Sequence, residues 1–312
     1  MLTLEFVMWN NCCNNCQFCW QRLWDDKTTH LNEKQKLECI KKCFQMVDEK
    51  GTDCDILIVG GEVYCDHGQK VNEALGKLYR KVADKIRSGE VRFLYANTNL
   101  TYSDRSNLLN LLEAFEGIED SLKFTTSYDL DGRFNRQTKD EQAKICAPLN
   151  REQLFFDNLA FINENYPKVN TVVNTIITRA VADAVMGKNG AEKYDPLWLM
   201  DKYPNTVAWV NLIPYIPIKG DTSLDVKYSE TVKVLEVANK KEPGYFRRYV
   251  ESLDQNQDKL LYEYHSDEGL VEKTADTKPC GHNENFSLIN RADECYLCRL
   301  KEYYIDNQER LH

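Results

Sequence analysis

Strand-like and helix-like segments alternate along the first 215 residues, and this alternation constrains the fold more than any other feature of the sequence. The strand-like segments are short, apolar and rich in β-branched residues, and they span 2–8, 54–59, 91–97, 121–127, 169–178 and 206–214. Segments with apolar residues at helical spacing lie between them, at 31–50, 71–87, from Ser103 onward, and at 150–166. Asn32 is the candidate N-cap of the first helix. Strands and helices in this order predict parallel strands joined by right-handed crossovers, closed as an α/β partial (β/α)6 TIM-like barrel.

Polar residues gather where these strands end. In barrels of this kind, functional groups collect at the carboxyl ends of the strands. That rule brings to one mouth the loop after the first strand and Gly60, Gly61, Glu62, Asn99, Ser127, Asp129, Asn174, Thr175 and Pro214. Asn, Asp and Ser also favour strand ends as turn and cap residues, which is the alternative interpretation for each of them.

The loop after the first strand contains Cys12, Cys16 and Cys19 in the pattern Cys-x3-Cys-x2-Cys. Four thiolates usually close an iron-sulfur cluster or a structural zinc site, so three would leave one metal corner open to a substrate or cofactor. Cys13 would change the first spacing, and we interpret it as a bystander. The alternatives are a zinc knuckle and a cluster of buried thiols.

The second strand ends on Gly60, Gly61 and Glu62. Two glycines allow the backbone to approach a ligand closely, and the carboxylate can accept charge-assisted hydrogen bonds from an ammonium group. The pairing of this motif with Cys-x3-Cys-x2-Cys resembles the radical S-adenosylmethionine (radical SAM) superfamily. The resemblance covers about the first 215 residues and implies a [4Fe-4S] cluster on the three cysteines, with SAM chelating the fourth iron.

Further SAM contacts follow from the same resemblance. Phe18 matches the aromatic residue near the adenine, and the Gly-Gly-Glu stretch matches the one that binds the methionine ammonium. Ser127 and Asp129 resemble a Ser-x-Asp near the ribose or carboxylate, although Asp131 offers a second register. Asn99 could bond the ribose. Arg133 is a candidate partner for a carboxylate of SAM or substrate, but a solvated surface arginine is the preferred interpretation.

The resemblance implies an oxygen-sensitive enzyme that receives an electron from a donor such as flavodoxin or ferredoxin. It would cleave SAM to a 5′-deoxyadenosyl radical that abstracts hydrogen from a substrate. A peptide or protein side chain is the preferred substrate, although no module to grip a leader peptide precedes the first strand. The alternative substrate is a nucleoside or nucleic-acid base. A non-catalytic SAM or iron-sulfur scaffold is a third possibility.

A different pattern begins near residue 220, which predicts a barrel domain at 1–220 and an extension at 221–312. Segments 229–240 and 245–264 have helical character, and 286–298 predicts a hairpin with its turn at 290–293. Cys280, Cys295 and Cys298 resemble the start of a SPASM/twitch extension, which implies a second [4Fe-4S] cluster. Zinc is the alternative, with His282 as the fourth ligand.

Composition bears on partners and compartment. No run of eighteen apolar residues and no export signal occur, so we expect a cytoplasmic protein without a membrane span. A net charge of −9 without a dense basic cluster disfavours duplex nucleic acid. Twelve cysteines without an export signal indicate metal or redox chemistry rather than disulfides. Five of them fit no motif and are expected to be buried or surface thiols: Cys39, Cys43, Cys54, Cys65 and Cys146.

Overall fold

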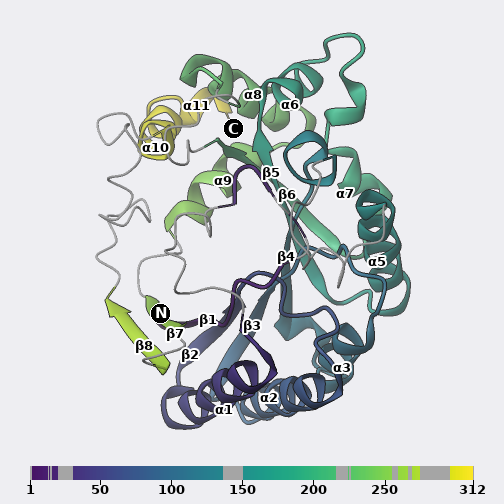
Figure 1. The fold of residues 1–312 in the computed structure, drawn as a ribbon. Coiled ribbons are helices and arrows are strands. Elements are labelled where there is room, and N and C mark those ends of the chain that lie inside the picture. Colours follow the sequence, from purple (N-terminus) through teal and green to yellow (C-terminus); the bar gives the residue numbers. More distant parts are fainter. Residues whose placement is uncertain are drawn as a thin grey trace. The chain divides into compact units, whose positions relative to one another are not determined.

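The computed structural model describes residues 2–12, 14, 16–19, 31–135, 150–215, 224, 226–254, 259–265, 269–274 and 296–311. Its strands form one eight-stranded sheet with the order β6-β5-β4-β3-β2-β1-β7-β8 (Figure 1). They are β1 (Leu2–Val7), β2 (Cys54–Val59), β3 (Val91–Asn97), β4 (Leu122–Ser127), β5 (Asn170–Ile177), β6 (Val207–Pro214), β7 (Lys259–His265) and β8 (Gly269–Thr274). The first six run parallel, so the predicted α/β partial barrel is confirmed.

The helices alternate with the strands as the sequence predicts. They are α1 (Glu33–Lys50), α2 (Gln69–Arg87), α3 (Ser106–Ala114), α5 (Arg151–Asn165), α6 (Arg179–Val185), α7 (Trp198–Lys202), α8 (Tyr228–Lys241), α9 (Tyr245–Asp254), α10 (Tyr296–Asp306) and α11 (Gln308–Leu311). Short turns of other kinds are the 3-10 helices η3 (Glu119–Ser121) and η5 (Glu192–Tyr194) and the π-helix η4 (Leu130–Phe134).

Contacts divide the chain into two compact units. The first unit is Met1–Val173, Tyr203–Trp209 and Asp258–Thr274, and the second is Asn174–Lys202, Val210–Gln257 and Ala275–His312. The expected domain boundary near residue 220 lies outside the described residues and stays a prediction.

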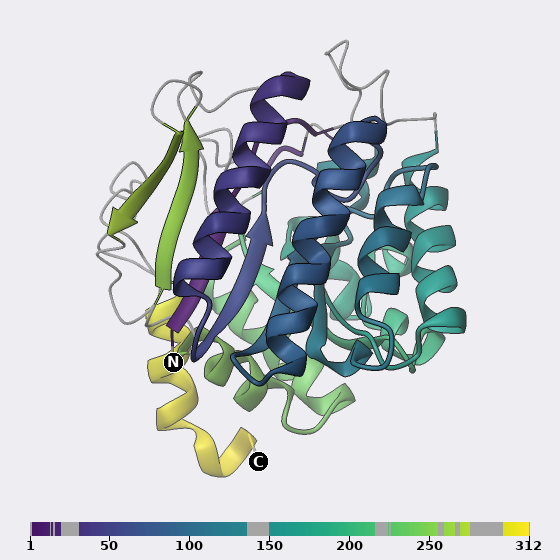
Figure 2. The same cartoon turned by 90° about the horizontal axis from the view of Figure 1, so that it is seen from below.

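In the first unit, β1 to β4 pair in parallel and their helix-facing side chains form the core. Leu94 and Ala96 of β3 and Phe124 of β4 are fully buried, whereas the side chains between them are half-exposed. Figure 2 shows α1 and α2 side by side against these strands. Asn32 caps α1 as predicted: its side chain accepts from the Gln35 backbone N–H at 3.0 Å.

The predicted helix over 245–264 is only partly correct. Helix α9 ends at Asp254, and Lys259–His265 form β7, which lies parallel to β1 with Thr3 opposite Lys259. β8 follows antiparallel to β7. The intrinsic propensities of the residues in this segment do not distinguish helix from strand. Pairing with β1 stabilises the strand.

The second unit packs α8, α9 and α10 together. The Tyr245 hydroxyl donates to the Val210 carbonyl at 2.7 Å and accepts from the Leu212 N–H at 2.9 Å. Phe246 stacks on Tyr303 with ring centroids 6.1 Å apart. The predicted second strand of the hairpin is wrong, because α10 begins at Tyr296; the remaining hairpin residues lie outside the described residues.

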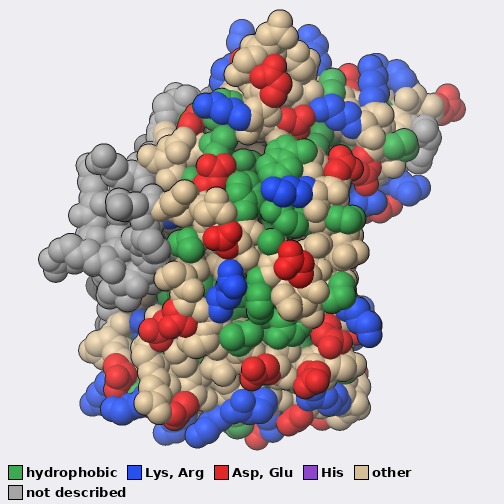
Figure 3. Space-filling model, turned by 90° about the vertical axis from the view of Figure 1, so that its right-hand side faces the viewer, with side chains coloured by type: hydrophobic (Ala, Val, Ile, Leu, Met, Phe, Trp, Pro, Cys, Tyr) green, Lys and Arg blue, Asp and Glu red, His purple; other side chains and the backbone are tan. Residues whose placement is uncertain are grey.

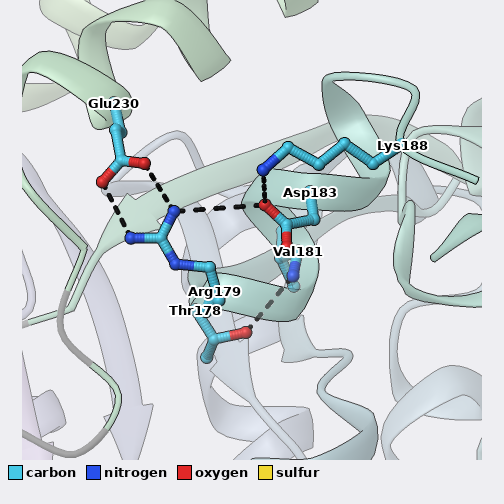
Figure 4. A network of polar contacts seen from close by, with 6 residues as sticks. All are labelled: Thr178, Arg179, Val181, Asp183, Lys188 and Glu230. Atoms are coloured by element: carbon cyan, nitrogen blue, oxygen red, sulfur yellow. Dashed lines mark hydrogen bonds and ion pairs between the residues drawn. The ribbon is translucent and has the colours of Figure 1, made fainter.

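An ion-pair network ties α6 to α8 within this unit (Figure 4). Arg179 donates to both carboxylate oxygens of Glu230, at 2.5 and 2.8 Å, and Lys188 donates to Asp183 at 2.6 Å. The Thr178 hydroxyl accepts from the Val181 N–H at 3.3 Å and caps α6. Across the described part of the chain, no helix has the length and apolar character that a membrane span requires.

Candidate functional site

The loop after β1 runs directly beside the glycines that end β2. The Gly61 N–H donates to the Trp9 carbonyl at 2.6 Å, and the Glu62 N–H donates to the Asn11 carbonyl at 2.8 Å. A Cβ on Gly60 would lie 2.7 Å from the Trp9 carbonyl oxygen, and one on Gly61 would collide with the Asn11 carbonyl. Both positions therefore need glycine, because the colliding atoms are backbone and cannot move aside.

The three cysteines of this loop interact electrostatically with one buried arginine, Arg133. Cys16 is 7% exposed, and Cys12 and Cys19 are half-buried. Burial raises the pKa of the Cys16 thiol, and the positive charge of Arg133 partly opposes this increase. The pKa of Arg133 is in turn raised by its interactions with Cys12, Cys16 and Cys19. Among the described residues, no three Cys, His, Asp or Glu side chains lie close enough to share a single metal ion.

Arg133 is buried, so the interpretation as a solvated surface arginine is wrong. It is 8% exposed and lies on the π-helical turn η4, where the Gly132 carbonyl accepts from the Gln17 N–H at 2.9 Å. A Cβ on Gly132 would collide with the Phe18 ring, so this glycine lets η4 close onto the cysteine loop. Within the described structure, the Arg133 Nε and Nη1 atoms are buried without a hydrogen-bond partner.

The electrostatics of Arg133 indicate an anionic surrounding. Burial lowers its pKa, but the interactions with Cys16, Asp129, Cys12 and Cys19, groups that become negative when they lose a proton, together outweigh burial, and the pKa is raised. Asp129 is 4% exposed, whereas Asp131 is exposed. Of the two registers that the sequence left open, Asp129 is therefore the one that lies beside Arg133 and the cysteines.

The Glu62 carboxylate points into the protein and is fully buried. It accepts from the Tyr64 N–H at 2.9 Å, from the Asn99 N–H at 2.5 Å, and from the Thr98 hydroxyl at 3.0 and 3.1 Å. Burial raises the pKa of Glu62 to about 7, and these donors oppose that increase. The carboxylate thereby fastens the loop after β3 to the end of β2.

Lys36 and His67 form a chain of hydrogen bonds that ends at the backbone carbonyl of Glu62. Lys36 Nζ lies 3.0 Å from His67 Nδ1, and His67 Nε2 lies 3.0 Å from the Glu62 carbonyl. Burial lowers the pKa of His67 to about 3, so the ring is neutral near pH 7. Since an ammonium only donates, Nδ1 accepts and Nε2–H donates to Glu62. Trp9 Nε1 donates to the same carbonyl at 3.3 Å.

Several residues of this site were missed in the sequence. Thr98 and Thr101 follow β3 beside Asn99, and Asn14 lies inside the cysteine loop; their proximity to predicted residues was the available signal. Lys36 and His67 carry no such signal, because helix α1 and the segment before α2 bring them together only in the fold.

The remaining predicted residues belong to other strands or lie outside the described residues. Ser127 ends β4 and is half-buried. Asn174, Thr175 and Pro214 belong to the second unit, where the Asn211 amide donates to the Asn174 side chain at 3.1 Å and Thr175 is buried. Cys280, His282 and Cys295 and the side chain of Cys298 lie outside the described residues. Four of the five cysteines that fit no motif are buried: Cys39, Cys43, Cys54 and Cys65. The fifth, Cys146, lies outside the described residues.

Comparisons with known proteins bear on the fold. The sequence matches no known family profile and no curated protein. A solved structure described as histidine-tagged anSMEcpe with bound AdoMet aligns over 99% of this chain and 94% of its own, with a TM-score of 0.52 and 13% identity. HydG, a maturase of the [FeFe]-hydrogenase, aligns over 80% of this chain and 54% of its own, with a TM-score of 0.47 and 13% identity. At this identity the likeness to the AdoMet-bound structure shows the fold alone, an α/β partial barrel.

Proposed function

We propose that this chain is a radical SAM enzyme with a [4Fe-4S] cluster on Cys12, Cys16 and Cys19. The observation that carries the proposal is the gathering of three cysteines around a buried arginine, at the carboxyl end of a parallel sheet. The structure that shares the fold holds AdoMet, as its description states, which supports SAM as the ligand.

The residues present fit both groups. A cluster with three thiolates is anionic, and Arg133 supplies a buried positive charge that interacts electrostatically with all three cysteines. Its Nε and Nη1 atoms lack a partner among the described residues and can donate to a carboxylate, such as that of SAM. The four irons of a cubane accept sulfur ligands at separate corners, so the cysteines need not converge on one point.

When bound, the cluster and SAM supply reductive cleavage of the sulfonium and hydrogen abstraction by the 5′-deoxyadenosyl radical. The chain itself holds and shields these groups. Gly60 and Gly61 let the cysteine loop lie against β2, and the buried Glu62 fixes the loop after β3. The contacts of Phe18 with adenine, of the Gly60, Gly61 and Glu62 stretch with the ammonium, and of Asn99, Ser127 and Asp129 with ribose or carboxylate belong to this proposal. Because the Glu62 side chain is buried, the proposed ammonium contact falls to the backbone of this stretch.

The substrate proposed is a peptide or protein side chain, with a nucleoside or nucleic-acid base as the alternative. On the face in Figure 3, Lys and Arg side chains alternate with Asp and Glu, with apolar side chains between them. The net charge of −9 disfavours a duplex nucleic acid as substrate. Cys280, Cys295 and Cys298 are proposed to hold a second [4Fe-4S] cluster, or zinc together with His282.

The test is anaerobic reconstitution followed by iron, sulfide and zinc analysis, then addition of dithionite and SAM. We expect 5′-deoxyadenosine from the wild-type protein and none from Cys16→Ala, whereas Cys54→Ala serves as a matched control at a buried cysteine of β2. About eight irons would support two clusters, and about four irons with one zinc would support a zinc-binding tail.

Two results would contradict the proposal. A wild-type protein that takes up no iron would exclude the cluster. A fully loaded protein that forms no 5′-deoxyadenosine with any peptide or nucleoside pool would favour the scaffold alternative. A comparison of peptide with nucleoside pools also separates the two substrate classes.

A further inference from the structure

The side chain of Asn99 has one orientation that its neighbours allow. Its Oδ1 atom accepts from the Thr101 N–H at 2.8 Å and from the Thr101 hydroxyl at 2.8 Å. Because a backbone N–H can only donate, the amide atom that faces it must be the oxygen. The Nδ2 group is therefore the one directed at Cys12, and it donates to Cys12 Sγ at 3.6 Å. A second donor to this sulfur is the Asn14 backbone N–H, at 3.4 Å.

The backbone of the same loop is fixed independently of the cysteine. The Asn99 N–H donates to Glu62 Oε2 at 2.5 Å, and the Thr98 hydroxyl donates to both carboxylate oxygens. Asn99 is only 6% exposed. The Asn99 amide is therefore held in a fixed position next to Cys12 Sγ. A hydrogen bond from a donor fixed in this way can orient a metal ligand and tune the metal that it holds.

A strained residue lies next to Asn99. Leu100 is fully buried and has φ 55°, in the left-handed region that is strained for a non-glycine residue. Asn158 of α5 holds this conformation, because its Nδ2 donates to the Leu100 carbonyl at 2.9 Å and to the Tyr102 carbonyl at 2.8 Å. Its Oδ1 accepts from Arg105 Nε at 2.6 Å. Strain that is held by a buried network in this way occurs mainly at functional sites.

We propose that Asn99 is a positioning residue that raises the reduction potential of the cluster through its N–H···S hydrogen bond to Cys12. This inference rests on the proposed function. A reduced cluster carries one more negative charge than an oxidised one, so a donor on a ligating sulfur stabilises the reduced form more. The bond therefore makes electron uptake easier. The role differs from the ribose contact that the sequence resemblance implies for the same residue.

The test compares the midpoint potential of the reconstituted cluster, from redox titration followed by electron paramagnetic resonance. Asn99→Ser removes the amide without adding a charge, and Asn99→Asp removes it and adds a negative charge. We expect the potential to fall in the order wild type, Asn99→Ser, Asn99→Asp. Asn165→Ser is the matched control: it makes the same amide-to-hydroxyl change at an exposed residue at the end of α5, so its potential should equal that of wild type.

The outcomes separate this inference from the proposed function. A wild-type protein without a cluster would refute the proposed function itself. If cluster-loaded Asn99→Ser has the wild-type midpoint potential, the proposed role of Asn99 is overturned. A lower midpoint potential in Asn99→Asp would not rescue it, because the added negative charge alone would explain that decrease. Loss of iron from both folded Asn99 variants, with iron retained in Asn165→Ser, would overturn the tuning role, because Asn99 would then be needed to hold the cluster at all.

Discussion

The buried Glu62 carboxylate predicts an unusual pH dependence of stability. The pKa of Glu62 is raised from 4.5 to about 7, chiefly by burial. Each tenfold change in an ionisation constant is worth about 1.4 kcal/mol, so the raised pKa corresponds to about 3 kcal/mol. The folded protein binds the proton more tightly than the unfolded chain does. This contribution to stability is therefore complete below about pH 4.5 and is lost as the pH rises to about 7.

Glu62→Gln removes the ionisation and keeps the shape. One of the two backbone donors, the Tyr64 or the Asn99 N–H, then faces an NH2 group and loses its acceptor, at a cost of about 1–3 kcal/mol. At about pH 5 the variant should be less stable than wild type by that amount. At about pH 8 the wild type has lost about 3 kcal/mol, so the variant should be equally stable or more stable.

The assay is urea unfolding of the metal-free protein between about pH 5 and pH 8, followed by tryptophan fluorescence. The difference in unfolding free energy between the two proteins should change by about 3 kcal/mol across this range. Two parallel curves would refute the reasoning, because they would mean that Glu62 has the same pKa in the folded and unfolded states.

Three further substitutions probe the packing around the site and away from it. Gly61→Ala should lower the unfolding free energy by about 1–3 kcal/mol and reduce iron uptake, because the new Cβ meets the Asn11 carbonyl; wild-type iron content would contradict this. Asn158→Leu should cost about 3 kcal/mol in a urea titration, since two buried carbonyls lose their donor, and a cost under about 1 kcal/mol would show that the loop holds itself. Arg179→Ala should cost less than about 1 kcal/mol near pH 7, because the pair with Glu230 is solvent-screened at 48% and 27% exposure. Hydrogen bonding to Arg179 lowers the pKa of Glu230 to about 2, so the small stability difference between variant and wild type should vanish as the pH falls from about 4.5 to 2. A loss of several kcal/mol of unfolding free energy in Arg179→Ala near pH 7 would contradict the screening argument.

Local patterns were sufficient to predict most of the barrel. The strand at Cys54–Val59 and the capped helix at Glu33–Lys50 have the predicted positions, because a β-branched run and a capping box act within a few residues of chain. Glycines at 60 and 61 were predicted to let the backbone approach a ligand, which stays a prediction. The neighbours that the structure shows for them, the Trp9 and Asn11 carbonyls, were not identified from the sequence.

The structural features that the sequence did not predict depend on contacts between residues far apart in the chain. The strand at Lys259–His265 depends on pairing with β1, and no local signal encodes that partner. Arg133 is buried because a π-helical turn folds it under the cysteine loop, whereas its sequence neighbours suggest a solvated position. The inward direction of Glu62 depends on Thr98 and Asn99, which follow a different strand.

The position of β1 between β2 and β7 has a consequence for biosynthesis. Thr3 pairs with Asp55 on one side and with Lys259 on the other. During translation, the strand that carries the cysteine loop therefore gains its second neighbour only after residue 265 has left the ribosome. Contacts so distant in sequence form slowly, since a long stretch of chain must be ordered first. The loop should thus acquire its final geometry as one of the last steps of folding, and the cluster proposed here would be loaded after that step.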